Sequence, residues 1–185
     1  MRFFIALVPP PELQRDLWAA MGPVREREFP VRWVKPEGIH LTLKFLGDVT
    51  AERAGDLQHA LGEAAAGMRS IALRVHGSGA FPDTTRPRVV WAGVEPEPAI
   101  ELLQDRVERV FAPLGFPTEG RTFRPHLTLG RVTREARPRD FAGLDAVLHA
   151  VAFEATALLD GVDLMRSELR RDGAVYHQVH RERLS

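Results

Sequence analysis

Apolar and polar residues follow one another in short runs that predict a mixture of strands and helices. Short apolar or alternating runs predict strands over residues 1–8, 31–34, 39–46, 71–75, 88–94, 122–132, 150–159, 162–169 and 175–181. Apolar residues at helical spacing predict helices over residues 11–28, 51–68, 96–114 and, more briefly, 141–148. Loops are expected at 77–87 and 133–140, and the pair Asp172-Gly173 predicts a tight hairpin between the last two strands.

The order of these elements bears on the fold class. The helices are separated by runs of one, two or more strands, which favours an α+β fold with mostly antiparallel sheets over regular βαβ units. The chain has 185 residues and no Pro- or Ser-rich linker divides it. We therefore expect a single domain over residues 1–185.

One tetrapeptide, His-Leu-Thr-Leu, occurs twice, beginning at His40 and again at His126. Both copies lie in predicted strands, where successive side chains point to opposite faces. His40 and Thr42 then share one face of their strand, as do His126 and Thr128, while the leucines between them point into a core. Each copy presents an imidazole beside a hydroxyl group.

Two such pairs suit the chemistry of a phosphate ester. An imidazole titrates near pH 6.5, so one ring can act as general base while the other acts as general acid. Threonine hydroxyls can donate to the non-bridging phosphate oxygens. The best-suited substrate is a phosphodiester with a strained internal leaving group, such as a 2′,3′-cyclic phosphate.

Two other interpretations of the repeat remain open from the residues alone. The histidines could be incidental members of half-buried strands, or they could bind a metal. Zinc usually takes four ligands, and no carboxylate stands at a ligand-like spacing beside either motif. We therefore predict no metal and no cofactor.

Composition narrows the class of protein further. The chain has no cysteine, which excludes a disulfide framework, an iron–sulfur cluster and a thiol nucleophile. Its 25 basic residues balance 25 acidic ones, which argues against a global electrostatic grip on long nucleic acid. The apolar run at residues 3–8 is too short to span a membrane. We expect a cytoplasmic, monomeric protein with no membrane partner.

The residues around the two motifs resemble the RNA 2′,3′-cyclic phosphodiesterase family, also called 2′-5′ RNA ligase, of the two-histidine phosphoesterase superfamily. The resemblance extends from residue 2 to about residue 132 and continues weakly to Tyr176. The matching segments are RFFIAL at 2–7, Trp33-Val34 with Pro36, HLTLKFLG at 40–47, RPRVVWAGV at 86–94 and FRPHLTLGR at 123–131.

This resemblance implies a bilobal α+β fold with pseudo-two-fold symmetry. Each lobe would contribute an antiparallel sheet with outer helices, and the two motifs would face each other across a central cleft. The implied reaction opens a terminal 2′,3′-cyclic phosphate, on RNA or on a small cyclic nucleotide, to a 2′-phosphomonoester, with 2′-5′ joining of RNA ends as a related reaction. A non-catalytic module that binds nucleotides or RNA ends on the same fold is the alternative.

The resemblance also implies roles for individual residues. By this resemblance, His40 and His126 are the general acid and general base, and the sequence leaves open which is which. Thr42 and Thr128 are the residues that donate hydrogen bonds to the phosphate.

Strand alternation extends the predicted site to neighbouring side chains. It places Arg124 on the face of His126 and Lys44 on the face of His40, so both are predicted to line the cleft. Arg131 falls on the opposite face unless a β-bulge intervenes, and it is included because it matches the family's flanking sequence. Phe45 and Trp91 are expected in the core.

Overall fold

The computed structural model describes residues 1–171 and 173–185, so Asp172 of the predicted hairpin turn lies outside the described residues. The strands are β1 (Arg2–Leu7), β2 (Val31–Trp33), β3 (Leu41–Asp48), β4 (Ile71–Phe81), β5 (Val89–Val94), β6 (His126–Val132), β7 (Glu154–Leu159), β8 (Gly161–Arg170) and β9 (Gly173–Arg183). The α-helices are α1 (Pro11–Ala20), α2 (Gly22–Arg25), α3 (Ala54–Ala65), α4 (Pro98–Phe111) and α5 (Leu144–His149). Short 3₁₀ turns are η1 (Pro36–Gly38), η2 (Ala51–Arg53), η3 (Ala112–Leu114) and η4 (Pro138–Phe141).

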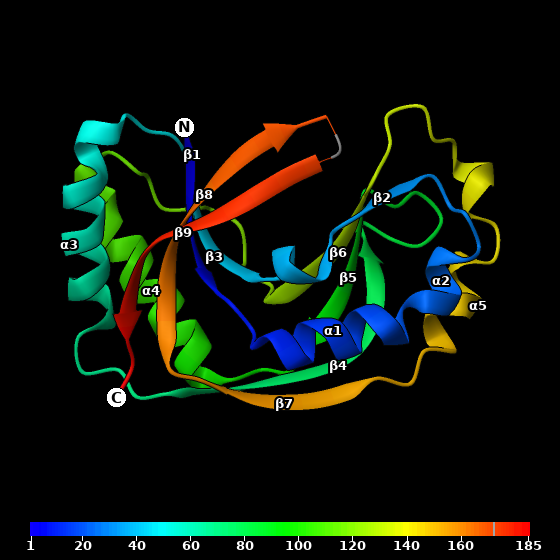
Figure 1. The fold of residues 1–185 in the computed structure, drawn as a ribbon, viewed down its shortest axis with the longest axis horizontal. Helices are drawn as coiled ribbons and strands as arrows, with labels where there is room; N and C mark the ends of the chain where they lie inside the picture. Colours follow the sequence, from blue (N-terminus) through cyan, green and yellow to red (C-terminus); the bar gives the residue numbers. More distant parts are fainter. Residues whose placement is uncertain (172) are drawn as a thin grey trace.

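The nine strands of the described residues all belong to one curled sheet (Figure 1). The strand order is β7-β4-β5-β6-β3-β1-β8-β9, β2 pairs with β6, and every pairing is antiparallel. The predicted α+β class is therefore confirmed. The expected arrangement has one sheet in each lobe. In the structure the two halves form a single continuous sheet, because β3 of one half pairs with β6 of the other at Leu41 and Leu127.

The helices divide between the two halves of the sheet. Helices α3 and α4 pack on each other and lie near β3, β8 and β9, whereas α2 and α5 pack together and α5 lies near β4. In Figure 1 the first group forms one end of the molecule and the second group forms the other. The pseudo-two-fold arrangement implied by the resemblance is visible in this division.

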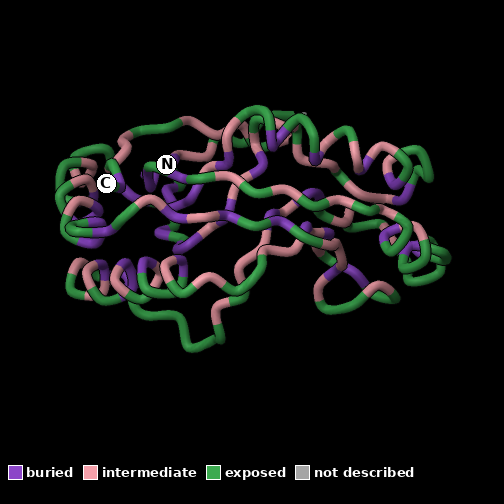
Figure 2. Tube along the Cα trace, turned by 90° about the horizontal axis from the view of Figure 1, so that it is seen from below, coloured by how far each residue is buried: buried purple, intermediate pink, exposed green. Residues whose placement is uncertain are grey.

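One face of the sheet carries the hydrophobic core. In β1, Phe3, Ile5 and Leu7 belong to the large cluster that includes the buried residues of the helices. Phe4 and Ala6 point to the other face and pack with Met165 from β8 in a small separate cluster. Buried segments follow the central strands, while the loops at the ends of the molecule are largely exposed (Figure 2). The small cluster on this second face contains no residue of a helix.

Two predicted boundaries differ from the structure for local reasons. The helix expected over residues 11–28 is interrupted at Met21, before Gly22-Pro23, and continues only as the short α2. The loop expected from Gly77 is instead strand β4 as far as Phe81. Gly79 is needed there because a Cβ atom would lie 2.5 Å from Cζ2 of Trp91 on the neighbouring strand.

A β-bulge in β3 reverses two predictions. Ile5 pairs with Lys44 and Ala6 pairs with Thr42, so Leu43 is an extra residue that changes the phase of the strand. Lys44 is consequently 3% exposed and lies on the helix side, while Phe45 is 59% exposed. The predictions that Lys44 lines the cleft and that Phe45 lies in the core are both wrong, because strand alternation was assumed to continue unbroken.

Lys44 instead forms a buried ion pair that joins three segments. Its Nζ atom lies 2.6 Å from Oε2 of Glu108 in α4 and donates a hydrogen bond of 2.9 Å to the carbonyl of Pro117. Gln104 Nε2 donates to the other carboxylate oxygen of Glu108. This network fixes the loop that leads from α4 to the second His-Leu-Thr-Leu motif.

Removing one partner of this ion pair leaves a buried charge unpaired. We expect Lys44→Met to lower the free energy of unfolding by about 3–5 kcal/mol, measured by urea denaturation. The double variant Lys44→Met/Glu108→Leu should recover a large part of that loss, because neither charge remains. Asp105→Ala is the matched control: it removes the exposed pair with Arg109, and it should change stability by less than about 1 kcal/mol. A Lys44→Met protein as stable as wild type would contradict the assignment of a buried pair.

Candidate active site

The two motifs lie next to each other in the middle of the sheet. Leu41 and Leu127 are paired in antiparallel strands, and both are fully buried on the core side. The flanking histidine and threonine residues of both motifs therefore project from the opposite face. Because the two strands run antiparallel, the histidine of each motif lies toward the same end of the pair as the threonine of the other motif.

Both histidine rings are held by the same hydrogen bond. Nδ1 of His40 lies 2.8 Å from the carbonyl oxygen of Gly38, and Nδ1 of His126 lies 2.7 Å from the carbonyl oxygen of Arg124. A carbonyl can only accept, so Nδ1 carries the proton in both rings. This leaves Nε2 of each ring as the nitrogen that can accept or donate a proton in a reaction.

His40 is enclosed by aromatic rings. Phe4 stacks on it with centroids 4.8 Å apart, and Tyr176 from β9 meets it edge-on at 4.9 Å. Burial lowers the pKa of His40 to about 4, the charges of Arg131 and His126 act in the same direction, and the Gly38 carbonyl opposes them. His40 is therefore neutral at neutral pH.

His126 has different surroundings. Phe81 meets its ring edge-on at 5.0 Å. Burial also lowers the pKa of His126, opposed by the hydrogen bond to the Arg124 carbonyl and reinforced by the charge of Arg131. The symmetry of the two motifs is thus not repeated in the residues around them.

A second bulge brings Arg131 to the face of the histidines. Trp91 pairs with Thr128 but Val90 pairs with Gly130, so Leu129 is the extra residue and Arg131 shares the face of Thr128. The charge of Arg131 lowers the pKa values of both histidines. Unbroken strand alternation would place Arg131 on the opposite face. The bulge at Leu129 changes the phase of the strand and brings Arg131 to the face of the histidines.

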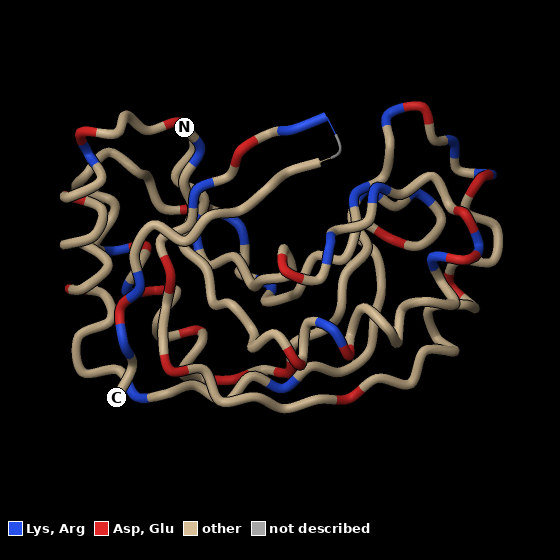
Figure 3. Tube along the Cα trace, viewed as in Figure 1, with Lys and Arg blue, Asp and Glu red and all other residues tan. Residues whose placement is uncertain are grey.

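Arg32 is a cation of this face that is not among the residues predicted from the sequence. It lies directly opposite Arg131 in the pairing of β2 with β6. Figure 3 shows basic segments side by side where these two strands run together. Like charges in this position repel each other unless an anion lies between them. No sequence signal marked Arg32, because only the tertiary structure pairs β2 with β6.

Other predicted residues lie elsewhere than expected. Arg124 precedes β6 instead of lying within it, because the strand expected from Thr122 begins at His126; the side chain of Arg124 is exposed and its carbonyl orients His126. Trp91 is half-buried on the face of Thr128 and packs on Phe81 at 5.1 Å, so its expected place in the core is wrong.

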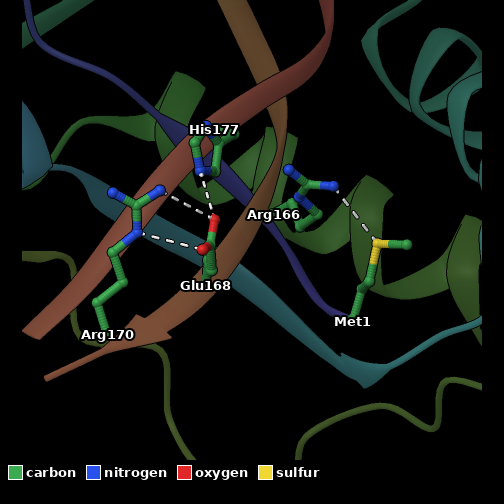
Figure 4. Close-up of polar contacts among 5 residues, drawn as sticks. All are labelled: Met1, Arg166, Glu168, Arg170 and His177. Atoms are coloured by element: carbon green, nitrogen blue, oxygen red, sulfur yellow. Dashed lines mark hydrogen bonds and ion pairs between the residues drawn. The ribbon is translucent and has the colours of Figure 1, made fainter.

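The β8–β9 hairpin brings Tyr176 to the site. The charged side chains of this hairpin lie on the face opposite Tyr176. Glu168 lies between Arg170 and His177, with its carboxylate 3.2 Å from each side chain (Figure 4). Tyr176 and His177 are successive residues of a strand and point to opposite faces. This cluster is therefore paired within itself and faces away from His40.

The described residues hold neither a metal-binding cluster nor a membrane-spanning helix. No group of three or more His, Asp or Glu side chains among them is placed to hold a metal ion. No helix formed by residues 1–171 or 173–185 is long and apolar enough to cross a membrane.

The low pKa of His40 predicts a dependence of stability on pH. The folded pKa of about 4 lies below the unfolded value of 6.5, so the unfolded state takes up the proton first as pH falls. The free energy of unfolding therefore keeps its full value above pH 6.5. As the pH falls from 6.5 to 4, protonation of the unfolded state lowers this free energy by up to about 3 kcal/mol. The free energies of unfolding of wild type and His40→Gln are measured by urea denaturation between pH 7.5 and 4. The value for wild type minus the value for His40→Gln should fall by this amount over that range. A difference that stays constant with pH would contradict the assignment.

Comparison with known proteins agrees with this geometry. The chain matches the model of the LigT-like phosphoesterase family twice, at residues 7–91 and 93–176, and His40 and His126 lie equally far into their matches. An RNA 2′,3′-cyclic phosphodiesterase of Methanothermobacter thermautotrophicus is 30% identical over 184 residues, covering all of this chain and 99% of the relative. The enzyme of the same name from Thermus thermophilus is 35% identical, covering 95% of this chain and 86% of the relative.

Solved structures show the same architecture. A crystal structure of a Thermus thermophilus protein superposes with a TM-score of 0.77 at 31% identity, over all of this chain and 98% of the other. Escherichia coli LigT in complex with 3′-AMP gives a TM-score of 0.78 at 24% identity, over all of this chain and 98% of the other, and shows the fold alone. The family resemblance predicted from the sequence is thus confirmed: the chain belongs to the LigT-like phosphoesterase family.

Proposed function

We propose that this protein hydrolyses the 2′,3′-cyclic phosphate of an RNA end or a nucleoside to a 2′-phosphomonoester, without a metal ion. The observation that carries the proposal is the pair of imidazoles on one face, each with Nδ1 held by a carbonyl and Nε2 left for proton transfer. The names of the two relatives supply the substrate class.

The reaction needs one proton acceptor and one proton donor. Nε2 of one imidazole takes a proton from water while the water oxygen forms a bond to phosphorus. The bond from phosphorus to the 3′ oxygen breaks, and the other imidazolium gives that oxygen its Nε2 proton. Charge and atoms balance, and the two rings exchange protonation states in each turnover.

The rest of the site suits the anion that forms. Thr42 and Thr128 offer hydroxyl donors to non-bridging oxygens, and Arg131 offers a guanidinium that can bind two oxygens at once. Arg131 lowers the pKa values of both histidines in the free protein. A bound phosphate acts in the opposite direction and permits one ring to be protonated. An RNA 5′-hydroxyl in place of water would give the 2′-5′ joining reaction with the same groups.

The first test is incubation with a nucleoside 2′,3′-cyclic phosphate in excess EDTA, with the product isomers resolved. We expect a 2′-phosphate from wild type, and a rate lower by roughly 10²–10⁴ in His40→Ala and in His126→Ala. His149→Ala is the matched control, since His149 is exposed on α5. Turnover that requires an added divalent ion would overturn the metal-free mechanism. Binding without turnover in any condition would identify a non-catalytic module.

A second test concerns the charge of Arg131. Both histidine pKa values are lowered in the free protein, so kcat/KM should follow a bell-shaped pH profile displaced to the acid side of 6.5. Arg131→Gln removes a positive charge that disfavours protonation, so both limbs should move to higher pH. Titration of the two rings by NMR in the free protein should move in the same direction. Unmoved limbs with a raised KM would limit Arg131 to binding substrate.

A further inference from the structure

Two arginines face each other on the side of the sheet that carries the histidines. Arg32 of β2 and Arg131 of β6 are direct partners in an antiparallel pairing, and both are exposed. Side chains in such a pair leave the same face of the sheet, with Cβ atoms about 4.5–5.5 Å apart. On its other side Arg131 is paired with Val89 of β5, so strand pairing brings no acidic residue beside the two cations.

This pair of cations is not neutralised within the part of the chain that the structure describes. Among residues 1–171 and 173–185, neither arginine has an ion pair or a side-chain hydrogen bond. By contrast, Arg181 on the same sheet lies 2.6 Å from Asp160 and 3.0 Å from Asp163. Like charges placed directly opposite each other lower stability. A strand pairing that keeps such charges together without a carboxylate is suited to an anionic ligand.

The two arginines stand at different distances from the histidines. The charge of Arg131 lowers the pKa of both His40 and His126. It also opposes the rise that burial causes in the pKa of Tyr176. Arg32 contributes to none of these three shifts. Because the effect of a charge falls with distance, the guanidinium of Arg32 lies farther from the imidazoles than that of Arg131.

Strand β9 runs between the same two positions. At its start, a Cβ atom on Gly173 would lie 4.0 Å from Cδ of Arg32. Three residues later, the ring of Tyr176 meets that of His40 at 4.9 Å. Three residues of a strand span about 10 Å. Two phosphates joined through one ribose fit this spacing, because the long side chain of arginine covers part of it.

We propose that Arg32 binds the phosphodiester on the 5′ side of the terminal nucleotide of an RNA substrate, while Arg131 lies at the cyclic phosphate. The fork of a guanidinium suits two oxygens of one phosphate. In an RNA end this diester is joined to the cyclic phosphate through the terminal ribose, and a nucleoside 2′,3′-cyclic phosphate lacks it.

The inference rests on the proposed function, because it takes the cyclic phosphate to lie at His40 and His126. A contact with a phosphate carries no sequence information. Arg32 therefore distinguishes an RNA end from a mononucleotide without selecting a base.

The test compares a nucleoside 2′,3′-cyclic phosphate with the same compound carrying a 5′-phosphate. The two substrates share their single base, so contacts with the base cancel in the ratio of their kcat/KM values. For Arg32→Gln, the ratio of the 5′-phosphorylated to the unphosphorylated substrate should fall by roughly 5- to 50-fold relative to wild type. Arg32→Lys should retain part of the ratio, since a positive charge remains. An unchanged ratio in Arg32→Gln would rule the contact out.

Arg109→Gln is the matched control, because it removes the same charge from an exposed arginine on α4 and should leave the ratio at the wild-type value. Salt gives a second measurement. In wild type the ratio should decline as NaCl is raised from about 0.01 to about 1 M, since exposed charges are screened. Arg32→Gln should show a much weaker decline. A wild-type ratio that does not respond to salt would contradict a contact between charges.

A binding measurement separates failure of this inference from failure of the proposed function. The affinities of wild type and Arg32→Gln are measured for a nucleoside 2′-phosphate and for the matching nucleoside 2′,5′-bisphosphate. A loss that is larger for the bisphosphate supports the subsite even if no cyclic substrate is turned over. Equal losses for both ligands, no loss for either, or a wild-type protein that binds both equally well would each overturn it.

The stability of Arg32→Gln distinguishes a phosphate ligand from a residue that supports the fold. The substitution relieves the repulsion between Arg32 and Arg131, so the urea midpoint of the ligand-free variant should be no lower than that of wild type. A lower midpoint would contradict the assignment of an unneutralised pair.

Discussion

The site depends on a single pair of residues at the centre of the sheet. Leu41 and Leu127 join the strands of the two halves, and both leucines are buried against the helices. Because side chains alternate along a strand, burying these two leucines forces both histidines and both threonines to the opposite face. The same contact thus closes the core and brings the two histidine–threonine pairs together on the other face. A register shift of one residue in either strand would turn the histidine and the threonine of that strand into the core.

Near-symmetry of the backbone does not produce equivalent histidines. Each ring is fixed by the carbonyl two residues before it, but Phe4 and Tyr176 enclose His40, whereas Phe81 meets His126 edge-on. A reaction that needs one base and one acid benefits from this difference, because two identical rings would compete for the same proton. The aromatic neighbours come from β1, β4 and β9, outside the repeated tetrapeptide, so the asymmetry arises from the strands on either side of the motifs.

The two bulges decide which residues after each repeated motif share the face of its histidine. In β3 the bulge turns Lys44 inward to an ion pair with Glu108, and in β6 the bulge turns Arg131 outward to the histidines. Each changes the face of the residues that follow it. Gly130, just after the second bulge, has no room for a side chain, since a Cβ would lie 2.4 Å from Cγ1 of Val31. The close pairing of β2 with β6 that results also places Arg32 opposite Arg131.

The sequence alone determined the α+β class, the family and the arrangement within each motif, because the repeat of His-Leu-Thr-Leu and the alternation of strands are local properties. It could not determine the places of Lys44, Phe45 and Trp91. A bulge depends on how one strand pairs with the next, and one extra residue inverts every later prediction from alternation. Arg32 entered the site for a similar reason, since only the folded chain brings β2 beside β6. Local pattern therefore identified the two histidine–threonine pairs, and strand pairing decided which neighbouring side chains share their face.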